Sequence, residues 1–415
     1  MPKTESTSLM KFYNDKLKSL KSSIDPHALQ ILKRLKESGF QAYLVGGGVR
    51  DLLVQLKPKD FDIATNALPN EVRKKVPYAF IIGRRFKLVH ARRGDQIFEI
   101  ATFRRAASSE ELEAAEADDR LFVEENFFGN IEEDSFRRDF TVNSLFYDPL
   151  AEEIVDHCQG LQDIESRTLR MIGVPEDRLI EDPIRILRAL RLSQKLRFTI
   201  EPTLREAITK LRHELRRSAA PRRREEWIKF FRLAELEMAL IELFDLGVFE
   251  SVLPTFHHLF TNETEREEFL SYIRRLPTIG FNFSDTTELF AAVLHLFLRV
   301  KFPEGADLEK LSEDEAFNLF TRDELGVFKA ELGHYLQAAQ FISSLKKRDS
   351  YLKKGERRQR AVVFHPTFML SLRLAYLVHE ITAAEYLFWV TEREKHASGH
   401  YKADPAEETE ISTQE

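Results

Sequence analysis

The pattern of hydrophobic and polar positions predicts a short mixed α/β segment near the start of the chain. Residues 27–39, HALQILKRLKESG, place apolar side chains at helical spacing and end on a glycine, which predicts a helix. Short apolar runs at residues 42–45, 61–64, 79–82 and 97–103 predict strands. We therefore expect an α+β fold in which a small mixed sheet forms the first domain.

The later pattern is mostly helical from about residue 131 onward. Residues 182–196, DPIRILRALRLSQKL, carry apolar side chains at helical spacing with arginines between them. Amphipathic helices with short breaks continue from 205 to 400. Residues 105–120, RAASSEELEAAEADDR, are polar and acidic, and this composition predicts a mobile loop or an exposed helix. The small head is therefore expected to precede a long all-α neck, body and tail.

Five segments follow from these changes in pattern along the 415 residues. We expect an N-terminal extension over 1–25, the head over 26–150 and a helical neck over 151–240. A helical body and tail should cover 241–400. The last residues, 401–415, are polar and acidic, which predicts a disordered tail.

Charge and cysteine content narrow the class of protein. The chain has 62 Lys and Arg against 68 Asp and Glu, a formal net charge of −6, which argues against a uniformly basic nucleic-acid-binding surface but allows a local basic groove. The single cysteine, Cys158, excludes an intramolecular disulfide and favours a reducing compartment. We find no apolar stretch of signal-peptide or membrane-spanning character, so we expect a cytoplasmic protein.

Two aspartates one residue apart stand in the second predicted strand, KDFDIATNA. Strand side chains alternate between faces, so Asp60 and Asp62 should point the same way. Two like charges on one face repel each other. Either this face is solvated, or a cation lies between the carboxylates.

A glycine turn precedes the aspartate pair in FQAYLVGGGVRDLL. Glycines allow backbone N–H groups to approach a bound group closely, although such a cluster alone is more often only a tight turn. The order strand, glycine turn, helix and acidic strand is what a nucleotidyl-transfer site needs, because Mg²⁺ binds carboxylates together with substrate phosphates. Glu99 is a candidate third carboxylate if its strand pairs beside the acidic one, and it is equally consistent with an ordinary exposed strand residue.

Several motifs in order resemble one family. LVGGGVRD followed by KDFDIATNA resembles the head of class II nucleotidyltransferases, the tRNA CCA-adding enzymes and bacterial poly(A) polymerases. EEDSFRRDFTVNSLFYDP resembles the R-R-D-F-x-x-N-A block, with Ser144 where alanine is usual, and RLIEDPIRILRALRL resembles the E-D-x-x-R block. PRRREEWIKFF resembles a fifth motif, with Arg223 and Arg224 in place of apolar residues. The resemblance runs from about residue 25 to about 390. It implies that the head over 26–150 is catalytic, that the neck over 151–240 recognises the nucleotide base, and that the body and tail over 241–400 bind RNA without reading its sequence.

The resemblance implies a role for each matching residue. Asp60 and Asp62 would bind two Mg²⁺ ions, which would activate an RNA 3′-hydroxyl and steady the leaving pyrophosphate. Asp139 would recognise a ribose hydroxyl. Asp182 and Arg185, at i and i+3 on one helical face, would read the edge of the base. The residues expected at the triphosphate and nucleotide are Gly47, Gly48, Arg50, Arg137, Arg138, Asp139, Asn143, Glu181, Asp182, Arg185 and Arg188.

One stretch favours a poly(A) polymerase over a CCA-adding enzyme. Residues 81–90, IIGRRFKLVH, resemble a segment that marks bacterial poly(A) polymerases, as do ENFFGNIEED and KKGERRQRAVVFHPTFMLSLRLAYL. Arg84, Arg85 and Lys87 would contact RNA or the triphosphate, unless they form only a basic edge hairpin. The function we expect is addition of AMP from ATP to RNA 3′ ends. ATP and RNA 3′ ends are the expected partners, with no obligate protein partner.

Two alternatives stay open. The chain ends acidic, whereas poly(A) polymerases often carry a basic tail, so CCA or A addition to tRNA is the first alternative. The lack of a His-Asp dipeptide argues against an appended phosphohydrolase domain, which some CCA-adding enzymes have. The second alternative is an inactive RNA-binding relative. The presence of both Asp60 and Asp62 argues against it.

Overall fold

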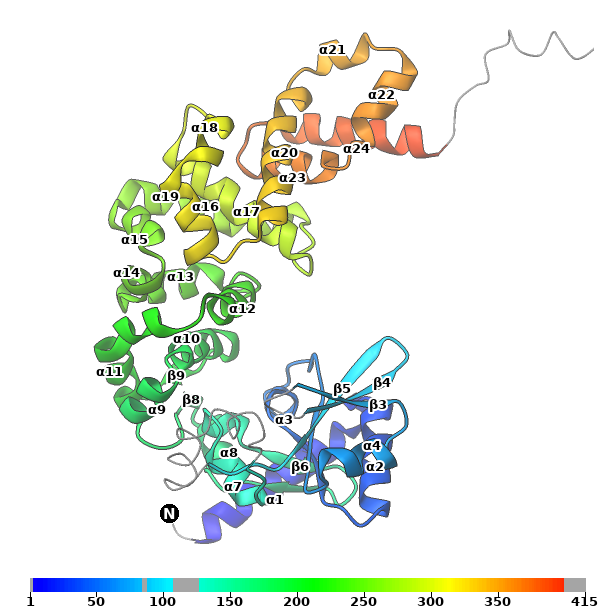
Figure 1. Ribbon diagram of the computed structural model, residues 1–415, viewed down its shortest axis with the longest axis vertical. Helices are drawn as coiled ribbons and strands as arrows, with labels where there is room; N and C mark the ends of the chain where they lie inside the picture. Colours follow the sequence, from blue (N-terminus) through cyan, green and yellow to red (C-terminus); the bar gives the residue numbers. More distant parts are fainter. Residues whose placement is uncertain (1–2, 84–87, 107–126, 399–415) are drawn as a thin grey trace, which may run out of the picture. The chain divides into compact units, whose positions relative to one another are not determined.

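The computed structural model describes residues 3–83, 88–106 and 127–398, and the chain divides into two compact units, Met1–Glu214 and Leu215–Glu415 (Figure 1). The first contains a mixed sheet with helices, and the second is helical. The predicted fold class, a mixed-sheet head followed by a mostly helical body, is confirmed. The finer divisions expected at residues 150 and 240 stay predictions.

A seven-stranded sheet forms the centre of the first unit, in the order β3-β4-β5-β2-β1-β6-β7. Strands β2 and β5 pair in parallel, and the other neighbours pair antiparallel. This order places β2 and β5, which carry the acidic residues of interest, side by side at the middle of the sheet. The strands are β1 (Ala42–Val45), β2 (Asp62–Thr65), β3 (Ala79–Ile82), β4 (Leu88–Arg93), β5 (Gln96–Thr102), β6 (Phe146–Asp148) and β7 (Glu153–Val155).

Helices pack on this sheet through apolar faces. Asp25 caps α2 by accepting the His27 N–H at 2.7 Å, and Pro26 occupies the first turn, where its missing N–H costs no hydrogen bond. The buried face of α2 packs against β1 and β2. Core residues of the sheet include Phe103 and Phe146, whose rings meet edge to face. The helices of this part are α1 (Lys3–Ser19), α2 (Pro26–Glu37), α3 (Gly47–Leu53), α4 (Pro69–Lys75), α7 (Ile131–Phe136) and α8 (Gly160–Glu165).

The expectation of a mostly helical chain from residue 131 is wrong for the last two strands of the sheet. β6 and β7 have three residues each, too few for a period-two pattern to be detected. β4 was also missed, because its sequence LVHARR combines two apolar residues with three basic ones. The predicted strands at 42–45 and 79–82 match β1 and β3.

Three helices after the sheet complete the first unit, and they correct one prediction. Asp182 and Arg185 do not share a helix, because α9 ends at Glu181 and α10 begins at Ile184. Asp182 is extended, with φ −143° and ψ 92°, because Pro183 restricts the residue before it to extended conformations. The helices are α9 (Pro175–Glu181), α10 (Ile184–Leu196) and α11 (Pro202–Leu211), beside a two-stranded pair of β8 (Thr168–Leu169) and β9 (Thr199–Ile200).

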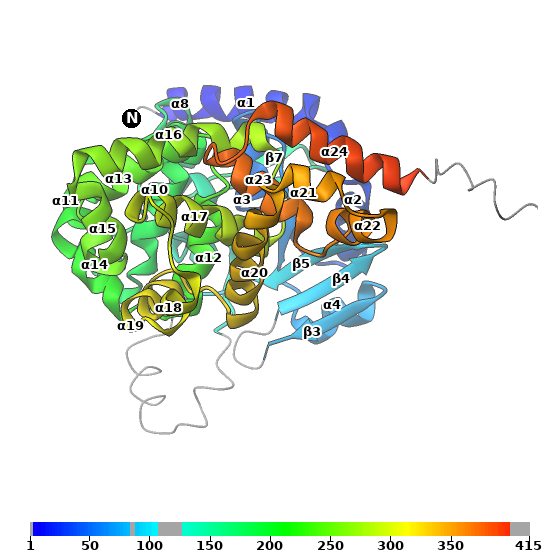
Figure 2. The same ribbon diagram turned by 90° about the horizontal axis from the view of Figure 1, so that it is seen from above.

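The second unit is a stack of helices around a phenylalanine-rich core. The Phe256 ring contacts those of Phe249, Phe260, Phe269 and Phe297. Helix α17 is buried along most of its length and packs against α16, α20 and α23, and α20 lies beside α23 (Figure 2). The helices are α12 (Ala220–Phe230), α13 (Leu236–Asp245), α14 (Val248–Val252), α15 (Pro254–Thr261), α16 (Glu263–Ile279), α17 (Thr286–Lys301), α18 (Leu308–Glu313), α19 (Glu315–Leu319), α20 (Lys329–Leu345), α21 (Arg348–Leu352), α22 (Glu356–Val363), α23 (Phe368–Leu377) and α24 (Ala383–Ala397). Of the helices that the structure describes, none is long and apolar enough to cross a membrane.

A buried ion pair in this unit explains why Arg224 stands where the fifth motif usually has an apolar residue. Arg224 of α12 donates from Nη1 and Nη2 to the Glu331 carboxylate at 3.0 and 2.8 Å. Its guanidinium carbon lies 4.0 Å from the centre of the Phe328 ring and 4.7 Å from that of Phe290. Thr286 also donates its hydroxyl to Glu331 at 2.6 Å. The pair therefore joins α12, α17 and α20 at a position where an apolar residue is usual.

Candidate active site

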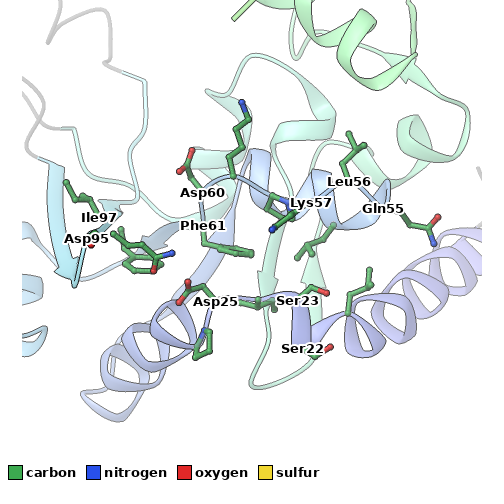
Figure 3. Close-up of a pocket in the computed structure, with 18 residues that line it drawn as sticks. Ser22, Ser23, Asp25, Gln55, Leu56, Lys57, Asp60, Phe61, Asp95 and Ile97 are labelled. Carbon is green, nitrogen blue, oxygen red and sulfur yellow. The ribbon is translucent and has the colours of Figure 1, made fainter. Parts of the chain in front are cut away.

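The aspartate pair lies at the start of β2, as its spacing predicts. Asp60 is exposed, and Asp62, the first residue of the strand, is partly buried. Figure 3 shows the Asp60 carboxylate and the Phe61 ring on different sides of this segment. Alternation along the segment directs the side chains of Asp60 and Asp62 to the same face.

Glu99 lies beside Asp62. Strands β2 and β5 run parallel with Ile63 opposite Ile100, so the residues that precede them, Asp62 and Glu99, are also neighbours on one face. The condition set for Glu99 to be a third carboxylate, that its strand pairs beside the acidic strand, is therefore met. On the other side of β5, His90 of β4 is opposite Glu99, with 3.5 Å between His90 Nε2 and Glu99 Oε1.

The acidic face changes the protonation of Asp62. Burial raises the pKa of the Asp62 carboxyl, the negative charges of Glu99 and Asp60 raise it further, and its pKa reaches about 6 although Arg138 opposes the shift. A cation bound between these carboxylates would relieve the repulsion. No group of three or more His, Cys, Asp or Glu side chains in the described segments converges to hold a metal. Two carboxylates completed by substrate phosphates fit Mg²⁺ without such a group.

The glycine turn comes into direct contact with the acidic segment. Gly46 has φ +69°, a conformation that favours glycine, and Gly48 lies against the segment before β2. A Cβ at Gly48 would be 2.9 Å from the Asp60 carbonyl oxygen, which is closer than real Cβ atoms come. A Cβ at Gly46 would be 3.5 Å from Arg138 Nη1 and 4.0 Å from Asp62 Oδ2. The turn, Arg138 and the aspartates therefore form one site.

Asp134 holds the arginines of the R-R-D block. Its carboxylate is buried and accepts from Arg137 Nε at 2.9 Å, Arg138 Nη2 at 2.9 Å and the Arg104 backbone N–H at 3.1 Å. Burial alone would raise the pKa of Asp134, but the guanidiniums of Arg138 and Arg137 outweigh it and hold the pKa below its usual value. Sequence reasoning missed Asp134. Its spacing of three and four residues from the two arginines was the available signal.

Arg50 is buried rather than exposed at the turn. It is 5% exposed and donates from Nε and Nη2 to Asp51 Oδ1 at 3.0 and 2.6 Å, and from Nη1 to Asn143 Oδ1. A buried guanidinium requires such partners. Its Nη2 lies 3.5 Å from where a Cβ on Gly47 would be, so the side chain supports the turn from within. The contacts expected from Arg50 and Asn143 to a nucleotide stay predictions.

Four further residues of the predicted site, Asp139, Glu181, Arg185 and Arg188, form an ion-pair cluster with residues of α9 and α10. Asp139 accepts from Arg185 Nε at 2.7 Å and pairs with Arg188. Arg185 also donates to Glu181 Oε2 at 2.9 Å. Arg178, which sequence reasoning missed, donates to the carbonyl oxygens of the arginine pair that precedes Asp139. The first unit therefore brings this block and the E-D-x-x-R block together.

A pocket is lined in part by Asp60 and the residues around it. Its volume is about 1020 Å³, and the Phe61 ring and Ile97 line it together with Lys57, while Asp60 stands at its rim (Figure 3). Arg84, Arg85 and Lys87, the predicted RNA or triphosphate contacts, lie outside the described residues.

Comparisons with known proteins match two parts of the chain to family models. Residues 42–170 match the family model described as Poly A polymerase head domain, and residues 197–260 match one described as Probable RNA and SrmB-binding site of polymerase A. Poly(A) polymerase I of Salmonella typhi is 40% identical over 244 residues, which cover 58% of this chain and 52% of that protein. The chain thus spans about half the length of this curated relative.

Two further relatives match over more of their length. Poly(A) polymerase I of Haemophilus influenzae is 34% identical over 312 residues, covering 71% of this chain and 69% of that protein. The CCA-adding enzyme of Lactobacillus johnsonii is 34% identical over 276 residues, covering 66% and 64%. The solved structure of the Bacillus stearothermophilus CCA-adding enzyme in complex with CTP has a TM-score of 0.62 at 21% identity, covering 90% of this chain and 83% of that one.

The head fold is that of the poly(A) polymerase head family. The chain belongs to the class II nucleotidyltransferase family, which includes bacterial poly(A) polymerases and CCA-adding enzymes.

Proposed function

We propose that the protein is a template-independent RNA nucleotidyltransferase that adds AMP from ATP to RNA 3′ ends and releases pyrophosphate. The observation that carries this proposal is the acidic face of Asp60, Asp62 and Glu99 beside the glycine turn. Similarity to two poly(A) polymerases, at 40% and 34% identity, supports adenylate addition.

Asp60 and Asp62 would hold two Mg²⁺ ions. When bound, these ions supply activation of the 3′-hydroxyl and charge stabilisation at the pyrophosphate. The protein contributes positioning and charge neutralisation. The absence of a side chain at Gly48 lets the glycine turn pack directly against the segment that carries the aspartates, and Arg138, fixed by Asp134, places a positive charge beside Gly46.

The cluster around Asp139 would take the ribose and the base. Asp139 would accept a ribose hydroxyl. Asp182, the extended residue between α9 and α10, and Arg185 of α10 would pair with the base edge. Arg185 is held by Asp139 and Glu181 in this structure. Nucleotide binding would therefore exchange at least one of these ion pairs for contacts to the nucleotide.

CCA addition is the second candidate function. The observation that favours it is the similarity to CCA-adding enzymes, which reaches 34% identity over 66% of the chain for the Lactobacillus johnsonii protein. Both activities use the same acidic face and glycine turn, so these features do not separate them.

Nucleotide extension tests the choice. Purified protein with Mg²⁺ receives either a tRNA ending before CCA or an unstructured RNA, with ATP alone, CTP alone or both. Long tails from ATP on both RNAs, with little use of CTP, are expected. Addition that stops after C, C and A on tRNA alone would identify a CCA-adding enzyme. The double variant Asp60→Ala, Asp62→Ala should bind RNA but add no nucleotide, and residual addition would contradict the metal assignment.

A further inference from the structure

One arginine joins two segments of the first unit that both belong to the predicted nucleotide site. Arg178 of α9 donates from Nη2 to the carbonyl oxygens of Arg137 and Arg138, at 2.9 and 3.1 Å. It also donates from Nη1 to Glu181 Oε2 at 2.6 Å. The two carbonyl groups lie 41 and 40 positions earlier in the chain. A single guanidinium therefore connects the R-R-D block to α9, which carries the glutamate of the E-D-x-x-R block.

The two carbonyl groups depend on a donor from outside their own segment. They follow α7, which ends at Phe136, and the last carbonyl groups of a helix have no N–H partner within it. A continued helix would bond the Arg137 carbonyl to the N–H of Thr141, but that N–H donates to the Arg170 carbonyl at 3.1 Å instead. Arg178, whose side chain is 18% exposed, supplies donors for both carbonyl groups.

Asp139 directly follows these carbonyl groups. The peptide bond is planar, so a fixed carbonyl at Arg138 also fixes the plane that carries the Asp139 N–H. On the other side, the Asp139 carbonyl accepts the Ile172 N–H at 3.0 Å. The backbone is therefore held both before and after this residue, and its direction brings the carboxylate within 2.7 Å of Arg185 Nε.

Arg178 is itself held in one place. Gly173 has φ +84°, and a Cβ there would be 3.6 Å from both Cγ and Cδ of Arg178, so the stem of the arginine lies against the glycine. The planar guanidinium presents its N–H groups in a fixed fork, which suits three acceptors in set positions. A lysine ammonium on a flexible stem would not reach all three acceptors with the same geometry.

The contacts of Arg178 are separate from those that a nucleotide would replace. The ion pair between Asp139 and Arg185 would have to open for the carboxylate to accept a ribose hydroxyl. The three hydrogen bonds of the Arg178 guanidinium use neither the Asp139 carboxylate nor the Arg185 guanidinium. They can therefore persist while that pair is exchanged, and they would keep the Asp139 backbone in place.

We propose that Arg178 is a positioning residue for the nucleotide. It does not contact the ribose. By holding the backbone before Asp139, it keeps the carboxylate directed at a ribose hydroxyl. This role rests on the function proposed above, because that function assigns the ribose to Asp139. It requires that discrimination between nucleotides with and without this hydroxyl depend on Arg178.

The test measures how strongly the full-length protein distinguishes ATP from analogues that each lack one ribose hydroxyl. Isothermal titration calorimetry with Mg²⁺ and without RNA gives the Kd of ATP, 2′-deoxy-ATP and 3′-deoxy-ATP. Three variants are measured beside the wild type. Arg178→Gln removes the guanidinium, and Arg178→Lys keeps the positive charge without the fork. Arg73→Gln, which removes an exposed arginine of α4, is the matched control.

The wild type should bind ATP about ten-fold more tightly than one of the two analogues, because that analogue lacks a hydrogen bond to a carboxylate. Both Arg178 variants should reduce this ratio to about three-fold or less, because a displaced carboxylate forms the bond poorly. Arg73→Gln should leave the ratio unchanged. A variant that is only less stable would bind all three nucleotides more weakly by one factor, so its ratio would not change.

An unchanged ratio in Arg178→Gln, or full recovery of the ratio in Arg178→Lys, would overturn the proposal. So would an equal fall of the ratio in Arg73→Gln. A wild type that binds ATP and both analogues alike would refute the ribose contact of Asp139, and the positioning role with it. A wild type that discriminates in binding but adds no nucleotide to RNA would refute only the proposed function.

Discussion

Asp62 and Glu99 lie next to each other on two parallel strands, with both carboxylates on one face of the sheet. This arrangement raises the pKa of Asp62 to about 6, through burial and then through the charges of Glu99 and Asp60. Because the folded protein binds the proton more tightly than the unfolded chain, this group favours folding below about pH 4. That contribution is lost as the pH rises through 6.

The variant Asp62→Asn should therefore be more stable than the wild type at pH 8, by about 1–3 kcal/mol in the free energy of unfolding, and equally stable near pH 4. Urea denaturation at the two pH values measures this difference. Asp95→Asn, at an exposed position on the turn between β4 and β5, should show no such pH dependence. A variant that is less stable than the wild type at both pH values would contradict the origin assigned to the shift.

Gly48→Ala should abolish nucleotide addition. The new Cβ would be 2.9 Å from the Asp60 carbonyl oxygen, so the segment that carries the aspartates would have to move. Gly333→Ala is the control, because Gly333 lies inside α20 with no atom within 4 Å of a new Cβ. It should add about 0.5–1 kcal/mol of stability and leave addition unchanged. Full activity in the Gly48 variant would show that the close contact is not needed.

Asp134→Asn should weaken ATP binding about ten-fold and reduce stability by about 1–3 kcal/mol at pH 7, because a buried acceptor for two guanidiniums loses its charge. The pKa of Asp134 is held below its usual value, so the difference in the free energy of unfolding between the variant and the wild type should persist down to about pH 4. It should vanish only as the wild-type carboxyl itself becomes protonated. Equilibrium binding of ATP and urea denaturation measure the two effects. Glu132→Gln, on the exposed face of α7, is the matched control, and an equal loss there would refute a specific role for Asp134.

Arg224→Met should destabilise the second unit by about 3–5 kcal/mol, because it leaves the Glu331 carboxylate buried without its charged partner. The double variant Arg224→Met, Glu331→Met should recover most of this loss. Thermal or urea unfolding of the single variant, the double variant and the wild type measures these differences in stability. If the double variant is as unstable as the single one, the loss does not come from the unpaired Glu331 carboxylate, and the ion pair itself stabilises the fold.

The sequence was sufficient to predict β1, β3 and the aspartate pair, but not the short strands β6 and β7 or the contacts between distant segments. β1 follows from local pattern, whereas the position of Glu99 beside Asp62 depends on the pairing of β2 with β5, which local pattern left open. Pro183 should have separated Asp182 from Arg185, since a residue before proline is seldom helical. The buried Arg50 has Asn143, 93 positions later, as a hydrogen-bond partner. Hydrophobic periodicity within a segment cannot predict a partner so distant in the sequence.

One chain of contacts has a consequence for chimaeras made from related enzymes. Lys195 of α10 donates to Asp51 Oδ2 at 2.7 Å, and Asp51 in turn holds Arg50 and, through it, Asn143. Side-chain contacts therefore connect α10, the helix that follows the head, to α3, the helix that follows β1. A chimaera that joined the head of one homologue to the neck of another between residues 150 and 195 would take position 51 from one parent and position 195 from the other. The residues at these two positions would then have to be matched to each other. A junction after residue 214 would transfer both positions together.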